Sequence, residues 1–169
     1  MSDLDGDYDP DNIFAKIVRG DAPAAKVFED HDTLAFMDVF PQVRGHVLVI
    51  HKRAHARNLL DAEPEALEAV IATVQRLARA VRAALKPDGV FIAQFNGQAA
   101  GQTVYHLHFH VIPRWAGEPL GRHGSGKMAD VAELKGIGVA EIFTPGAPLG
   151  AITSWLEQAL DRREALSAG

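Results

Sequence analysis

The chain contains no cysteine among its 169 residues. Disulfide bonds, cysteine-ligated zinc and a cysteine nucleophile are therefore all excluded. No apolar run approaches the ~20 residues that are needed to cross a bilayer. The first residues are acidic and polar rather than basic and then apolar, which argues against a secretory signal. We therefore expect a cytoplasmic protein with no membrane partner.

Positive charge is also scarce. The formal net charge is −5, and there is no long run of lysine and arginine. A nucleic-acid partner is therefore not expected. A small anionic ligand is still compatible with this charge, because backbone N–H groups and one or two cations can hold a phosphate. The length and the 47% of hydrophobic residues suit one globular domain.

Hydrophobic periodicity predicts a helix, three strands, a long helix and two further strands. The first helix is capped by Asp11 and ends near Gly20. The strands are expected at residues 26–29, 33–37, 46–51, 90–95 and 104–112, with a helical turn at 58–61. The long helix begins near Pro64 and carries one apolar face, formed by Leu67, Val70, Ile71, Val74, Leu77, Val81 and Leu85. This order predicts an α+β fold: a five-stranded antiparallel sheet with the long helix packed on it.

Composition divides the chain into three parts. Residues 1–10 are acidic, and we expect a disordered lead-in. Residues 11–115 hold the predicted domain. Residues 116–169 are glycine-rich and form an extension that ends in a helix around residues 152–165, which we expect to pack on the same domain.

Three histidines alternate with large apolar residues in the segment from His106 to His110. On a strand, residues i, i+2 and i+4 share one face at intervals of ~6.6 Å. His106, His108 and His110 would therefore form a row, while Leu107 and Phe109 would point into the core beneath the long helix. The glycine-containing loop before the strand could bring backbone N–H groups close to an anion.

Three interpretations fit this row. It is a polar strand face that happens to hold histidines, or a zinc site, since two histidines at i and i+2 can chelate the metal. Alternatively, a neutral imidazole attacks phosphorus while its neighbours orient it. No acidic or cysteine partner in the nearby sequence supplies further metal ligands, which disfavours the second interpretation.

The segment from Gly101 to Ile112 resembles the signature of the histidine-triad (HIT) superfamily, His-φ-His-φ-His-φ-φ with φ apolar. Segments 13–17, 34–38 and 45–50 are similar to the Hint-like branch, whose members bind purine nucleotides. The resemblance covers roughly residues 11–115, which we therefore assign as a HIT domain. It implies a HIT-like fold, a homodimer and no cofactor.

The resemblance implies a two-step nucleotidyl transfer on a purine nucleotide (AMP-like) substrate. His108 would attack the α-phosphorus of a nucleoside 5′-phosphoramidate or related conjugate, and water would then hydrolyse the nucleotidyl-histidine. The alternatives are a dinucleoside polyphosphate hydrolase, or a nucleotide-binding module whose role lies in partner contacts. Comparing the rates on each substrate would separate the enzymes, and loss of function in a His108 variant would separate enzyme from module.

The resemblance also implies roles for the neighbouring residues. His110 would bind a phosphate oxygen, Thr103 would serve the leaving group, and His106 together with His46 would fix the tautomers of the row. Asp38 would bind the ribose hydroxyls. The loop residues expected near the phosphate or leaving group are Asn96, Gly101, Gln102 and Val104, and those expected around the base are Phe14, Phe36 and Val39.

Many bacterial relatives bind a structural zinc through a Cys-x-x-Cys pair and two histidines. Asn12 and Ala15 stand at the cysteine positions in this chain, and His55 is a candidate remnant of the histidine pair. Since both thiolates are absent, we predict no structural zinc and no other metal site. Near-stoichiometric zinc in protein purified without added metal would contradict this prediction.

Overall fold

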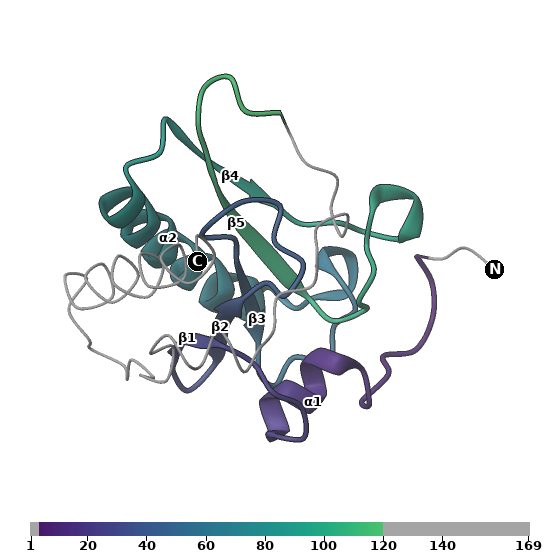
Figure 1. The fold of residues 1–169 in the computed structure, drawn as a ribbon. Helices are drawn as coiled ribbons and strands as arrows, with labels where there is room; N and C mark the ends of the chain where they lie inside the picture. The colour runs from purple at the N-terminus through teal and green to yellow at the C-terminus, as the bar shows by residue number, and fades with distance from the viewer. Residues whose placement is uncertain (1–3, 120–169) are drawn as a thin grey trace.

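All strand pairs in the sheet are antiparallel, and the strand that comes last in the sequence lies between two others. In the computed structural model, which describes residues 4–119, five strands pair in the order β1-β2-β3-β5-β4. They are β1 (Lys26–Glu29), β2 (Thr33–Met37), β3 (Val47–His51), β4 (Gly89–Ala93) and β5 (His108–Arg114). β5 has hydrogen-bonded neighbours on both sides (Figure 1). The predicted α+β class and five-stranded antiparallel sheet are confirmed.

The long helix α2 (Pro64–Leu85) covers one face of the sheet (Figure 1). It starts with proline, whose fixed φ suits the first turn. The apolar stripe packs against side chains of β5 and the residue before it, and the buried cluster includes Val70, Val74, Leu77, Val81, Leu107, Phe109 and Val111. Ile71, which we predicted on this face, is 47% exposed. It points about 100° away from Val70 around the helix axis and lies outside the buried stripe of the helix.

The short helix α1 (Ile13–Arg19) packs on the opposite face. Its cap is Asn12, whose Oδ1 accepts from the backbone N–H groups of Phe14 and Ala15 at 3.0 Å each. The predicted cap, Asp11, instead pairs with Arg19. Phe14 and Ile17 form a second apolar cluster with residues of β2 and β3, namely Leu34, Phe36, Leu48 and Ile50.

β5 begins four residues later than predicted, at His108 rather than at residue 104. Its first pairing is His108 with Ile50, near the end of β3, and β4 reaches only as far as the partner of His110. Residues 104–107 therefore have no neighbouring strand to pair with. Consequently His106 lies outside the sheet, and the prediction that it belongs to the strand is wrong. Its side chain is still on the side of His108, because both rings contact Phe14, while Leu107 packs with Phe109 in the cluster beneath α2.

Two short helical turns complete the described structure. The predicted turn at 58–61 is present as η1 (Leu59–Asp61), and η2 (Gln98–Ala100) lies in the loop before β5. No helix in the described part of the chain is long and apolar enough to span a membrane. The predicted terminal helix at 152–165 lies outside the described residues, as does all of the extension after residue 119.

Candidate active site

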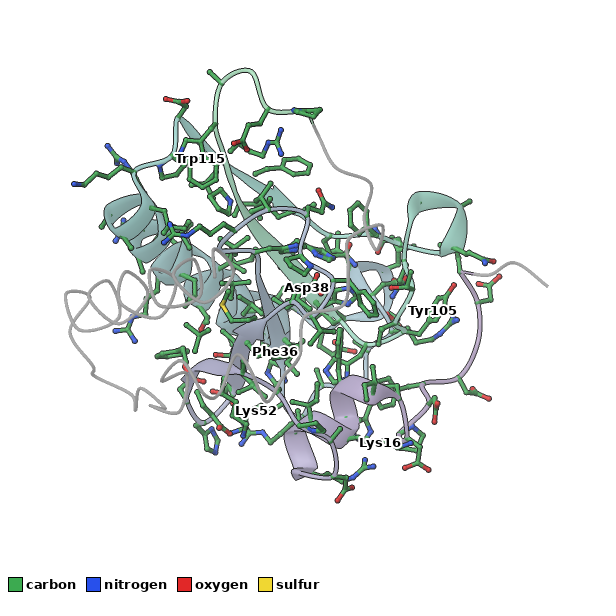
Figure 2. The ribbon with its side chains drawn as sticks, in the orientation of Figure 1. Lys16, Phe36, Asp38, Lys52, Tyr105 and Trp115 are labelled. Atoms are coloured by element: carbon green, nitrogen blue, oxygen red, sulfur yellow. The ribbon has the colours of Figure 1, made fainter. Side chains whose placement is uncertain are left out.

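A cavity of about 580 Å³ opens on the sheet face that α1 covers. Its wall is largely apolar, and it is formed by α1, the segment after it, β2 with the residues that follow, and the start of β5. Eight of the predicted site residues line it: Phe14, Phe36, Asp38, Val39, Thr103, Val104, His108 and His110. Phe36 and Asp38 come from the end of β2 and the residue after it (Figure 2). The structure therefore brings together the predicted base, ribose and phosphate positions.

His108 begins β5 and is 2% exposed. Its Nδ1 lies 2.6 Å from the carbonyl oxygen of His106. Because a carbonyl oxygen only accepts, Nδ1 carries the proton, and in the neutral ring the lone pair is on Nε2. The edge contact with Phe14, at 5.1 Å between ring centroids, further restricts the imidazole. His108 is thus held as the tautomer that a nucleophile needs.

His110 is fixed in the opposite tautomer by a chain of hydrogen bonds. The backbone N–H of Gln42 donates to Nδ1 of His46 at 3.2 Å, so the proton of neutral His46 is on Nε2. Nε2 of His46 lies 2.9 Å from Nδ1 of His110 and donates to it. His110 then carries its proton on Nε2, and its ring lines the cavity. In the cavity wall, the lone pair of His108 is therefore on Nε2, whereas Nε2 of His110 bears the proton.

His106 is behind the cavity rather than in its wall. Its ring is 1% exposed, and Nε2 lies 2.8 Å from the carbonyl oxygen of His51. Nδ1 lies 2.8 Å from the hydroxyl of Tyr8. Burial lowers the pKa of His106 to about 4, so the ring is neutral near pH 7. This placement is compatible with a supporting role for His106, which stays a prediction.

Gln102 organises the loop before β5 instead of facing the cavity. Its buried Oε1 accepts from the N–H of Gly97 at 2.8 Å, and its Nε2 donates to the carbonyl oxygens of Arg57 and Val104 at 2.6 and 3.0 Å. Gly101 has φ +99°, a left-handed conformation that favours glycine. Asn96 accepts from the N–H of Leu59 at 3.1 Å. These three predicted phosphate-loop residues are not in the cavity wall, and their contact with a ligand stays a prediction.

One group of side chains could in principle ligate a metal. Ligand atoms of Asp38, His46 and His110 lie within 4.8 Å of one another. Nε2 of His46 is also 3.5 Å from the Asp38 carboxylate. However, the hydrogen bond between His46 and His110 already uses two of the three potential ligand atoms, and a cation would have to displace its proton. The absence of a metal stays a prediction.

The positions at which the resemblance implies zinc ligands in bacterial relatives have other contacts in this chain. Asn12 caps α1, and Ala15 is buried within that helix. The ring of His55 stacks on Tyr8, with 5.0 Å between centroids and 3° between planes.

Sequence reasoning missed three residues that fix the histidines: Tyr8, Gln42 and His51. Tyr8 fell in the segment expected to be disordered, and the other two act through backbone atoms that no side-chain pattern reveals. The His51 ring also accepts from the N–H groups of Arg53 and Ala54 at 3.1 and 2.8 Å, which ends β3 in a tight turn. A histidine for which the sequence suggested no role therefore supports His106.

Comparison with known proteins agrees with this geometry. The HIT domain family model matches residues 19–117. A HIT-like protein of Mycobacterium tuberculosis is 46% identical over 108 residues, which are 64% of this chain and 74% of that protein. An adenylylsulfatase of Arabidopsis thaliana is 37% identical over 119 residues, covering 67% of this chain and 60% of that protein. The crystal structure of a Bartonella henselae HIT-like protein matches with a TM-score of 0.67 at 43% identity, covering 90% of this chain and 99% of that one. The chain therefore belongs to the HIT domain family.

Proposed function

We propose that the protein hydrolyses conjugates of purine nucleoside 5′-monophosphates in two steps, through a nucleotidyl intermediate on His108. The observation that carries this proposal is the hydrogen bond from Nδ1 of His108 to the His106 carbonyl, which leaves the lone pair on Nε2 of a ring in the cavity wall. A neutral imidazole fixed in this way is an effective nucleophile toward phosphorus.

The first step forms a bond between Nε2 of His108 and the α-phosphorus. The bond from phosphorus to the leaving group breaks, and the leaving group departs with the electron pair and is protonated. In the second step water attacks the same phosphorus, the mononucleotide is released, and the imidazole returns to its neutral form. The Nε2–H of His110 would donate to a phosphoryl oxygen in both steps, where fixed donors stabilise developing negative charge.

The other residues of the cavity wall suit the base, the ribose and the leaving group of a nucleotide conjugate. Phe14 and Phe36 lie edge to face, 5.4 Å between centroids, and offer an apolar slot for a base. The Asp38 carboxylate lines the cavity, and a carboxylate accepts hydrogen bonds from hydroxyl groups such as those of ribose. Thr103 is exposed and could serve the leaving group. A volume of about 580 Å³ lies within the range of small-molecule sites, ≈ 300–1,000 Å³.

The exposed edge of the sheet supports the proposed homodimer. β4 has β5 as its one sheet neighbour among the described residues, so no described strand pairs with its other edge. Phe91 and Ile92 on this strand are 42% and 38% exposed. An open edge with large apolar side chains is a favourable surface for pairing with a second copy.

Trapping of the intermediate tests the proposal most directly. The protein is mixed with a small excess of adenosine 5′-phosphoramidate and quenched in base, which preserves the phosphorus–nitrogen bond. We expect mass spectrometry to locate one AMP group on the peptide that contains His108, and we expect none in the His108→Ala variant. Failure to find the adduct in single-turnover experiments, together with no hydrolysis, would refute the mechanism.

The identity of the leaving group is a separate question, and the relative rates of hydrolysis of different substrates answer it. The candidates share the AMP half and differ only beyond the α-phosphorus: an amine, a sulfate, as the name of the Arabidopsis relative suggests, or a second nucleotide. We expect the highest kcat/KM for the phosphoramidate. A tenfold or greater preference for diadenosine polyphosphates or for adenosine 5′-phosphosulfate would reverse this order while leaving the role of His108 intact.

A further inference from the structure

The segment of residues 4–12, which we call the N-terminal strap, lies along the rear of the histidine site. The carbonyl oxygen of Leu4 accepts from Nη1 of Arg57 at 3.1 Å. The Tyr8 ring stacks on His55, and its hydroxyl lies 2.8 Å from Nδ1 of His106. The strap ends at Asn12, the cap of α1. One side chain of the strap, Tyr8, therefore contacts a member of the triad directly.

The direction of the hydrogen bond between Tyr8 and His106 follows from the other side of the ring. Nε2 of His106 faces the carbonyl oxygen of His51, which cannot donate, so Nε2 carries the proton. Because the ring is neutral, Nδ1 has no proton and accepts from the Tyr8 hydroxyl. The two contacts hold the imidazole of His106 from opposite sides.

The position of residue 106 matters because its carbonyl oxygen sets the tautomer of His108. Residue 106 lies before β5, so ladder hydrogen bonds do not fix it. On its C-terminal side the chain is held by the hydrogen bond from the Leu107 N–H to the Ala56 carbonyl at 2.8 Å. Because the His106 carbonyl and the Leu107 N–H belong to one planar peptide unit, this bond also orients the carbonyl, and the two bonds to the His106 ring, to His51 and to Tyr8, hold the residue from its side chain.

We propose that Tyr8 is a positioning residue for the nucleophile: by fixing the ring of His106, its hydroxyl acts together with the Leu107–Ala56 hydrogen bond to hold the carbonyl that keeps the proton of His108 on Nδ1. This inference rests on the proposed function of His108. Tyr8 is not among the residues that line the cavity. Its loss should therefore slow the attack on phosphorus and leave nucleotide binding nearly unchanged.

The test compares Tyr8→Phe with Tyr105→Phe. Tyr8→Phe removes the hydroxyl and keeps a ring to stack on His55. Tyr105 is the only other tyrosine and precedes His106 directly; its ring lies under the Arg57 guanidinium, 4.4 Å from the centroid, a contact that phenylalanine preserves (Figure 2). Thermal unfolding of both variants verifies that they are folded.

We expect the single-turnover rate of Tyr8→Phe to fall roughly three- to tenfold, the range for loss of one hydrogen bond, with little change in KM. Tyr105→Phe should retain the rate of the unchanged protein. An unchanged rate in Tyr8→Phe, or an equal fall in both variants, would overturn the proposal.

Nitrogen NMR of ¹⁵N-histidine-labelled protein measures the protonation of each ring nitrogen without any substrate. In Tyr8→Phe we expect the Nδ1–H population of His108 to decrease and the pKa of His106 to rise from about 4, because a donor to Nδ1 favours the neutral ring. The groups that face this ring are Tyr8, Phe14, His51 and His55. Unchanged His108 signals would refute the positioning role. If the unchanged protein shows no turnover, the proposed function fails, while these signals still decide whether Tyr8 sets the His108 tautomer.

A second measurement uses the fluorine signal of a labelled Tyr8 and so tests the hydrogen bond without removing the Tyr8 hydroxyl. In the Tyr105→Phe background Tyr8 is the only tyrosine, so 3-fluorotyrosine labels it alone. We expect the fluorine signal to shift with the titration of His106 at acidic pH, because the hydroxyl loses its acceptor when Nδ1 is protonated. A fluorine signal that does not respond to that titration would contradict the contact on which the inference depends.

Discussion

Replacing His108 by alanine is expected to lower kcat by roughly a thousandfold or more. His108 is the one side chain proposed to bond to phosphorus, so no neighbour can substitute for it. The cavity wall should otherwise persist, because Phe14, Asp38 and His110 come from three other positions along the chain. AMP binding, measured by calorimetry, should therefore change only a few-fold. Steady-state kinetics with the phosphoramidate give the rate.

A matched control separates loss of the nucleophile from loss of any histidine. His31 lies in the exposed turn between β1 and β2, away from the cavity. His31→Ala should retain the full rate. After removal of a nucleophile we expect a residual rate far below about a tenth of the original. If His108→Ala kept more than that fraction, turnover would have to proceed without a covalent intermediate on His108. If the His108 variant also kept the cellular role, a binding module would be the better description.

Acidification from about pH 7 to about pH 4 is expected to remove roughly 3 kcal/mol of stability through His106 alone. The pKa of His106 is about 4 in the folded chain, against an ordinary value of 6.5, and burial is the main cause. Above the ordinary value the ring is neutral in both states, and its contribution is fully present. As the pH falls from 6.5 toward 4, the unfolded chain takes up the proton first, so unfolding becomes easier.

Urea denaturation at several pH values measures this effect against a variant that does not titrate. His106→Asn keeps one donor and one acceptor but has no group that ionises in this range. Its free energy of unfolding should fall less steeply between about pH 6.5 and about pH 4 than that of the unchanged protein, by roughly 3 kcal/mol. His31→Asn, at an exposed position, serves as the control and should follow the unchanged protein. Parallel curves for the unchanged protein and His106→Asn would show that His106 protonates readily in the folded state.

Most of the fold could be predicted because its elements follow local rules. β1 and β2 begin and end where the sequence predicts them, on either side of the turn at residues 30–32. The stripe of α2 repeats at helical spacing, and Val70, Val74, Leu77 and Val81 are all buried. Errors occurred where a neighbour decides the outcome. The start of β5 depends on where β3 ends, and Ile71 is exposed because it lies outside the face of α2 that packs on the sheet.

The sequence by itself indicated which residues are the candidates for the chemistry. Alternation places His108 and His110 on one face of a strand, and the resemblance to the HIT superfamily adds Asp38, Phe14 and Phe36, which the structure places in the same cavity wall. Only the tertiary structure decided which nitrogen of each histidine in the site bears the proton. Which nitrogen of an imidazole bears the proton is set by its hydrogen-bond partner, and those partners are a hydroxyl, carbonyls and an N–H group from Tyr8, His51, His106 and Gln42. All but the His106 carbonyl come from parts of the chain remote from the triad. Because backbone atoms are the same in every residue, no sequence pattern identifies the carbonyls and the N–H group.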